Sequence, residues 1–159
     1  IKGAATTFTV VHMTSPSNTF YDYFVDDEMW VANTNDNCHS GGCTGAWVET
    51  GESTFSQNQP MQVDYFWAEN ENTGGMGTYY QKVFGQVGSS DYGHTANVVI
   101  DRSSQGYWIP YVFSPGKTYS YTIPNYVMDS PNQWIIGQEL SGGGSQSASE
   151  SYFTRNEYI

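Results

Sequence analysis

Two glutamates of this sequence lie where a carboxyl group could carry out acid–base chemistry. Glu49 ends the apolar run 46–48, and Glu139 follows the apolar stretch 134–137. Ionisation is costly beside apolar and aromatic residues, so we expect the pKa of each carboxyl group to be raised. We also expect both side chains to project from one face of a sheet, where two nearby carboxyl groups hold one proton more tightly than the other.

Such a pair predicts a hydrolase. With one water molecule between the two groups, the ionised glutamate can deprotonate the water while the protonated glutamate stabilises the developing oxyanion. This chemistry cleaves a peptide bond without a metal, serine or cysteine, and it loses its acid as pH rises toward neutrality. The alternative is that Glu49 and Glu139 are ordinary surface acids at strand ends, as most glutamates are.

The elements that must position these residues are β-strands. Short segments rich in β-branched and aromatic residues alternate with clusters of Gly, Pro, Asn, Asp and Ser, and no long window has the apolar spacing of a helix. We therefore predict a single all-β domain over residues 1–159, an antiparallel two-sheet β-sandwich of the concanavalin-like jelly-roll type. The expected strands are residues 6–12, 29–31, 46–49, 61–67, 79–84, 96–101 and 134–136.

Turn signals predict how some of these strands are joined. Residues 72–77 and 114–117 are expected to form turns between antiparallel neighbours. The Ser/Gly-rich stretch 141–151 is expected to be a loop before a last edge strand at 152–154.

The charge balance excludes several classes of partner. The chain has 16 acidic and 5 basic residues and a formal net charge of −11, which repels phosphate backbones and anionic lipids. No apolar run could span a bilayer, and residues 1–11 lack a signal-peptide pattern. We expect a mature, secreted monomer with no nucleic-acid or membrane role. The scarcity of basic residues also suggests an acidic working environment.

The cysteines and the other acidic residues raise the question of a metal site. Cys38 and Cys43 lie in a Gly-rich stretch, and a small disulfide loop is the expected arrangement in an exported chain. The alternative, a metal site with His39, lacks evident further ligands. The acidic stretch 22–28 lacks the ligand order of a calcium loop, so we interpret it as a solvated hairpin end. We expect no metal and no cofactor.

Several short motifs resemble those of the glutamic peptidases of the fungal, scytalidoglutamic (eqolisin) type. That family has Trp-Val-Gly-Ile-Asp-Gly, then a cysteine, then Ala-x-x-Gln-Thr-Gly. This chain has Trp-Val at 30–31, then its cysteines, then Ala-Trp-Val-Glu-Thr-Gly at 46–51. Trp-Ala-Glu at 67–69 matches the family's Trp-x-Glu, and the segment 134–139 looks like the strand that carries its catalytic glutamate. The likeness spans residues 29–140.

Two departures from the family pattern matter. Glu49 stands where the fungal enzymes have glutamine, and in this it looks like the neprosins, which pair two glutamates. Glu139 lies two positions further from its tryptophan than the pattern. Without a β-bulge, a shift of two keeps the side chain on the same face and moves it one pleat along the strand.

The resemblance implies an acid-acting glutamic endopeptidase without a cofactor, in which the two glutamates are catalytic and polypeptides bind across a concave face. Trp30, Tyr65 and Trp67 would line the substrate groove, and Glu69 would be a supporting acid. The aromatic residues could equally be packing residues of a large sheet. The alternatives are a jelly-roll glycoside hydrolase that uses the two glutamates and a non-catalytic carbohydrate-binding β-sandwich.

Overall fold

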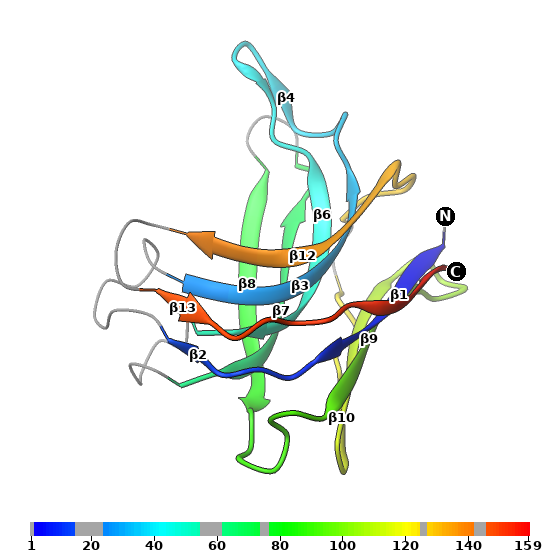
Figure 1. Cartoon of the computed structure of the whole chain (residues 1–159). Coiled ribbons are helices and arrows are strands. Elements are labelled where there is room, and N and C mark those ends of the chain that lie inside the picture. The colour runs from blue at the N-terminus through cyan, green and yellow to red at the C-terminus, as the bar shows by residue number, and fades with distance from the viewer. Residues whose placement is uncertain (1, 15–23, 55–61, 74–76, 125–126, 142–145) are drawn as a thin grey trace.

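The computed structural model describes residues 2–14, 24–54, 62–73, 77–124, 127–141 and 146–159. Within these ranges the structure contains β-strands and no helix. The strands form two main antiparallel sheets that share one core (Figure 1). The prediction of an all-β, antiparallel two-sheet sandwich is therefore confirmed. The described residues include no helix that could cross a membrane.

The first sheet has the strand order β11-β10-β9-β1-β14. Its strands are β1 (Gly3–Thr9), β9 (Thr95–Arg102), β10 (Trp108–Ser114), β11 (Lys117–Ser120) and β14 (Thr154–Tyr158). The first and last strands are neighbours in this sheet, and the N–H of Lys2 donates a hydrogen bond to the carbonyl of Ile159 (2.8 Å). The two ends of the described chain therefore lie side by side (Figure 1).

The second sheet carries the candidate site and has the order β12-β3-β6-β7-β8. Its strands are β3 (Phe24–Asn33), β6 (Ala46–Ser53), β7 (Asp64–Glu71), β8 (Thr78–Gln86) and β12 (Gln133–Ser141). The register runs without interruption from β12 across β3 and β6 to β7, whereas a bulge lies between β7 and β8 at Tyr65 and Phe66. Two short pairs complete the described strands: β2 (Met13–Thr14) with β13 (Ser147–Ala148), and β4 (Cys38–His39) with β5 (Gly42–Cys43).

The core lies between the two main sheets and is built from alternate residues of each strand. Val25 and Met29 of β3 are fully buried there, as are Val98 and Ile100 of β9 in the opposite sheet. Because successive side chains of a strand point to opposite faces, the residues between the inward ones of β3 point to the outer face of the second sheet. That outer face carries the candidate site.

Most of the predicted strands exist, but their bounds differ. The segment 29–31 is only the middle of β3, which begins at Phe24, and the segment 46–49 continues to Ser53 in β6. The strand expected at 61–67 is β7, although residue 61 lies outside the described ranges. Both β3 and β6 were underestimated because their extensions are rich in Asp, Glu, Gly and Ser, which have low strand propensity.

The predicted turns join antiparallel neighbours. The turn at 114–117 connects β10 to β11, and the stretch 72–77 connects β7 to β8, although residues 74–76 lie outside the described part of the chain. The stretch 141–151 contains the short strand β13, and its residues 142–145 are not described. The last strand is β14, which begins where the expected edge strand was to end.

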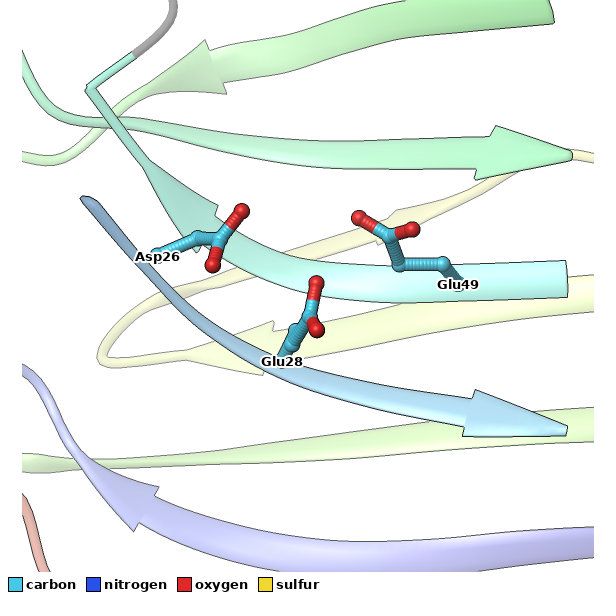
Figure 2. A group of neighbouring side chains, drawn as sticks. All are labelled: Asp26, Glu28 and Glu49. Carbon is cyan, nitrogen blue, oxygen red and sulfur yellow. The ribbon is translucent and has the colours of Figure 1, made fainter. Parts of the chain in front are cut away.

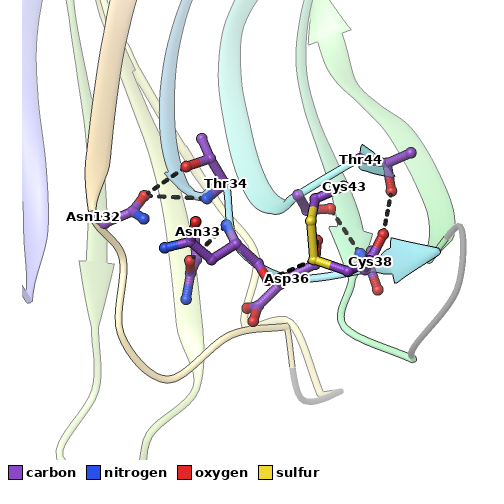
Figure 3. The surroundings of a disulfide bond; sticks show 10 residues. Asn33, Thr34, Asp36, Cys38, Cys43, Thr44 and Asn132 are labelled. Atoms are coloured by element: carbon purple, nitrogen blue, oxygen red, sulfur yellow. Dashed lines mark hydrogen bonds between the residues drawn. A yellow bond between two sulfur atoms is a disulfide. The ribbon is translucent and has the colours of Figure 1, made fainter. Parts of the chain in front are cut away.

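The predicted disulfide joins Cys38 and Cys43, which face each other across the β4–β5 pair (Figure 3). Because both sulfur atoms are bonded to each other, they cannot act as thiolate ligands in a metal site with His39. Asn37 fixes the base of this loop, since its side-chain amide donates to the carbonyls of Gly45 (2.7 Å) and Glu71 (3.0 Å). The loop is thus tied to the ends of β6 and β7.

Candidate active site

The outer face of the second sheet carries both glutamates that the sequence singles out. Glu49 of β6 lies opposite Trp30 of β3, and Glu139 of β12 lies opposite Asp26 of β3. Opposed residues of antiparallel strands share a face, so the two glutamates project from the same side of the sheet. However, β3 lies between their strands, and its own acidic side chains separate them.

Glu28 of β3 is the carboxyl group that meets Glu49. Carboxylate oxygens of Asp26, Glu28 and Glu49 lie within 4.8 Å of one another. Figure 2 shows these three groups turned toward each other from two neighbouring strands. All three residues are buried, with 1%, 5% and 5% of their surface exposed. Three buried carboxyl groups so close together keep their protons to higher pH than isolated carboxyl groups do, because desolvation and mutual repulsion both oppose ionisation.

Glu49 is the acid of this group. Burial raises its pKa well above the ordinary value, and the nearby Glu28 and Asp26 raise it further. Burial also raises the pKa of Glu28, to about 7, against the opposing effects of Trp30 and Glu49. The mutual effect of the two glutamates raises the pKa of Glu49 and lowers that of Glu28. The first proton to leave this pair therefore comes from Glu28.

Glu139 is exposed at the margin of the group and acts on it through charge. The pKa of Asp26 is raised by burial, then by Glu28 and by Glu139, and the charge of Glu139 also raises the pKa of Glu28 and of Glu49. No bulge occurs between β12 and β3, so Glu139 lies one pleat beyond the position that the family pattern gives to its glutamate. That position is occupied by Gly137, opposite Glu28.

The prediction that the acidic stretch 22–28 is a solvated hairpin end is wrong for the residues that the structure describes. Asp26, Asp27 and Glu28 lie within β3 and are buried; Asp22 is not described. A signal for Glu28 was present in the sequence. It precedes Trp30 by two positions, so once the strand is extended through the acidic residues, Glu28 and Trp30 must share a face.

Three predicted substrate-binding residues point to the other face of the sheet. Tyr65, Trp67 and Glu69 of β7 are buried, and Glu69 lies opposite the core residue Val48. Trp67 stacks on Tyr121 with a centroid distance of 4.6 Å. Burial raises the pKa of Glu69 to about 8. These side chains do not share a surface with Glu49; of the predicted groove residues, only Trp30 does.

A second pair of acidic residues lies on the inner face. Asp27 of β3 and Glu52 of β6 are opposed in the register, and both are fully buried. Glu52 accepts a hydrogen bond from the N–H of Val11 (3.1 Å), and Asp27 accepts one from the amide of Gln138 (2.9 Å). Burial raises the pKa of both groups, and their mutual effect raises the pKa of Glu52 further and lowers that of Asp27. Glu52 therefore holds its proton more tightly than Asp27.

The cluster of Asp26, Glu28 and Glu49 on the outer face also has the spacing of a binding site for a hard cation. Its three carboxylate oxygens lie close enough to surround one divalent ion. Burial and the neighbouring acids raise the pKa of Glu49 and of Glu28, which opposes the ionisation that carboxylate ligands need. Acid–base chemistry and cation binding both fit this cluster, and a chelator distinguishes the two.

No protein-family model matches this chain, and a search of curated proteins finds no similar sequence. The resemblance to glutamic peptidases therefore remains an expectation from short motifs.

Proposed function

We propose that this protein is a secreted endopeptidase of the glutamic type, in which Glu49 is the acid and Glu28 is the base. The observation that carries the proposal is the close approach of these two buried carboxyl groups, whose oxygens lie within 4.8 Å of each other. Two carboxyl groups that share a proton can activate one water molecule and stabilise one oxyanion. Glu139, which the sequence alone had paired with Glu49, adjusts the pair by its charge.

The reaction conserves its protons. Ionised Glu28 removes a proton from water, and the water oxygen bonds to the carbonyl carbon of the peptide while Glu49 protonates the carbonyl oxygen. In the second step the C–N bond breaks. Glu28 gives its proton to the leaving nitrogen, and a hydroxyl of the tetrahedral intermediate returns a proton to Glu49. The products are a carboxylic acid and an amine, and both glutamates regain their starting states.

The substrate approaches from the β12 side of the cluster. Trp30 is partly exposed, Ile135 is 39% exposed, and Glu139 is exposed. A Cβ atom built on Gly137 would meet nothing within 4 Å, so space is open beside Glu28. The proposal places the substrate backbone in this space, next to the buried pair.

The working pH follows from the charge state of the pair. The sequence predicts activity in acid, whereas the structure raises the pKa of Glu28 to about 7. Glu28 is a base only when ionised, so the singly charged pair forms as pH rises toward that value. We expect an acid limb near pH 7 in the rate profile, and an alkaline limb where Glu49 loses its proton.

The spacing within the pair argues against an inverting glycoside hydrolase built on it. Inverting glycosidases place their two carboxyl groups about 6.5 to 9.5 Å apart to leave room for a water molecule, whereas retaining enzymes use about 5 to 5.5 Å. Oxygens of Glu28 and Glu49 lie within 4.8 Å of each other. A non-catalytic carbohydrate-binding module would not need the pair, so Glu49→Gln would leave its ligand binding intact.

The test is hydrolysis of an unfolded protein over roughly pH 3 to 9. Wild type, Glu49→Gln, Glu28→Gln and the control Glu157→Gln, which changes an exposed acid of β14, are compared after circular dichroism confirms that each is folded. We expect wild type and the control to cut and Glu28→Gln to lose at least about a hundredfold in kcat, as removal of a general base does. Glu49→Gln is expected to keep a small residual rate, since an amide still donates a hydrogen bond.

Three outcomes decide the proposal. Full activity of Glu28→Gln would refute its role as the base. Loss of wild-type activity on addition of a chelator would replace the proton-sharing mechanism with a metal-dependent one. Release of sugar from xylan, without release of peptides from protein, would mean that the protein is a glycoside hydrolase and not a peptidase.

A further inference from the structure

Three aromatic rings lie in a row beside the carboxyl pair, on the same outer face. Trp30 of β3 and Trp47 of β6 are stacked with a centroid distance of 4.8 Å, and Trp47 contacts Tyr79 of β8 at 5.7 Å. The register places Trp47 opposite Asn70 and Asn70 opposite Tyr79, so the two rings meet above Asn70. The rings therefore form one aromatic surface that runs from β3 to β8.

This row is not part of the core. The aromatic residues of β7 on the inner face are almost completely buried, whereas Trp30 and Trp47 are partly exposed and Tyr79 is 50% exposed. The hydroxyl of Tyr79 donates to the side-chain carbonyl of Gln81 (2.6 Å), which fixes the orientation of the exposed ring. A partly exposed, oriented row of rings costs hydrophobic free energy unless a ligand covers it.

We propose that Trp30, Trp47 and Tyr79 form a subsite for an aromatic side chain of the polypeptide substrate, within two residues of the bond that is cut. This inference rests on the proposed function of the neighbouring Glu28–Glu49 pair. The subsite adds Trp47 and Tyr79 to the substrate-binding residues. Of the groove residues predicted from the sequence, it includes only Trp30.

The distance from the row to the pair sets the position of the subsite. Trp47 and Glu49 are two residues apart on one strand, which corresponds to about 7 Å. An extended substrate advances about 3.3 Å per residue, so a side chain one or two positions from the scissile bond reaches the rings. Trp30, which lies directly opposite Glu49, joins the row to the reacting groups.

The charge of this face selects the kind of side chain. Among the described residues of the five strands that point outward here, none is Lys or Arg. Ile135 and Glu49 lie opposite Trp30, and the hydroxyl of Tyr79 contacts Gln81. An acidic side chain would therefore meet only negative or neutral groups. A neutral ring would stack on Tyr79 and Trp47 without loss of hydrogen bonds.

The test compares a peptide of small residues around the cleavable bond with a matched series in which Phe stands at one position at a time, up to four residues on either side of that bond. We expect cleavage to be faster when the ring lies within two residues of the cut. Tyr79→Ala should lower kcat/KM for the ring-bearing peptide about tenfold more than for the small-residue peptide, mainly through KM. Tyr79→Phe keeps the ring and should retain the preference.

The chain offers a matched control in Tyr80. It is the next residue of β8, it is 45% exposed, and it lies opposite Glu69 and so points to the other face. Tyr80→Ala should leave the preference intact. If wild type cuts both peptides equally, or if Tyr79→Ala and Tyr80→Ala act alike, the subsite is refuted while the proposed function stands.

A binding measurement separates the subsite from catalysis. Quenching of tryptophan fluorescence by the ring-bearing peptide is followed in wild type and in Tyr79→Ala. If no peptide is cut but the peptide binds wild type more tightly than Tyr79→Ala, the proposed function fails and the subsite stands. If xylo-oligosaccharides bind and the ring-bearing peptide does not, the row is a sugar platform and the inference is overturned.

Discussion

The charge of Glu139 acts on the buried carboxyl groups, although strand β3 lies between Glu139 and Glu49. Its negative charge raises the pKa of Glu28, of Glu49 and of Asp26. Replacing it with glutamine keeps the shape of the side chain and removes the charge. The pKa of Glu28 should therefore fall, because only burial and the remaining acids then oppose ionisation.

We predict that Glu139→Gln shifts the acid limb of the pH–rate profile to lower pH, by up to about one unit, and leaves substantial activity. The measurement is kcat/KM against pH, with the exposed Glu157→Gln as the control. Loss of activity at every pH would identify Glu139 as the base itself and would restore the pairing expected from sequence.

Gly137 provides a second test at the level of single residues. A Cβ at this position meets nothing within 4 Å, so Gly137→Ala should fold normally and be slightly more stable, by up to about 1 kcal/mol, because glycine weakens a strand interior. Gly137→Leu should also fold, but its side chain would fill the space beside Glu28. We expect cleavage of protein substrates to fall at least about tenfold, which corresponds to about 1.4 kcal/mol.

Unchanged kinetics of Gly137→Leu, in a variant shown by thermal unfolding to be as stable as wild type, would mean that substrate does not approach over β12. The opening would then have to be sought elsewhere around the cluster.

The sequence predicts part of the site because residue type and strand parity are local properties. The apolar flanks of Glu49 indicate a carboxyl group held from water, and the structure buries it. Glu28 was missed because three consecutive acidic residues resemble a solvated turn. Only the pairing of β3 with both β6 and β12 covers them, and that pairing joins segments far apart in the sequence.

At the level of the strands, Gly51 determines how closely β3 and β6 approach. A Cβ built on Gly51 would overlap the backbone carbonyl of Asp27, and Gly51 lies opposite Glu28 in the register. The contact between Glu28 and Glu49 depends on this close approach. A side chain at position 51 must push the two strands apart.

We predict that Gly51→Ala lowers the free energy of unfolding by about 1 to 3 kcal/mol, the usual cost of overpacking, and lowers activity as well. Urea unfolding provides the measurement. Gly137→Ala is the matched control, since it adds the same atom to a glycine of the same sheet where space is open. Equal stability of the two variants would contradict the role of Gly51.

The inward direction of Tyr65, Trp67 and Glu69 illustrates what a strand pattern cannot reveal. All eight residues of β7 are buried, so alternation between exposed and buried positions does not identify the inner face. The face becomes known only when β7 is paired with β6, where Thr50 and Val48 oppose Trp67 and Glu69. The sandwich itself was predictable, because it follows from strand propensity and turn residues along the whole chain.

The whole molecule holds several carboxyl groups whose pKa is raised by burial, and this links its stability to pH. A raised pKa means that the folded state binds a proton that the unfolded state has lost, so stability is greatest below the unfolded value and falls as pH rises through the folded value. For Glu28 this window runs from 4.5 to about 7. At about 1.4 kcal/mol per pKa unit, this residue alone changes stability by about 3 kcal/mol.

We predict that the protein unfolds more readily at pH 8 than at pH 4, and that Glu52→Gln reduces this difference. The amide can still accept from the N–H of Val11 and donate to Asp27, but it has no proton to lose. The melting temperature across pH, with Glu157→Gln for comparison, provides the measurement. A melting temperature that rises with pH in wild type would contradict the assignment of protonated buried acids.

The adjacency of β1 and β14 affects how the molecule can be attached to something else. Lys2 and Ile159 are hydrogen-bonded to each other in the first sheet, while Glu28 and Glu49 face outward from the second, with the core between them. A tether at Lys2 or Ile159 would therefore attach the molecule through the first sheet, on the side away from Glu28 and Glu49. A short linker could join these two ends, and new ends could be opened at the exposed residues 115–117, with the face that carries Glu28 and Glu49 still directed away from the support.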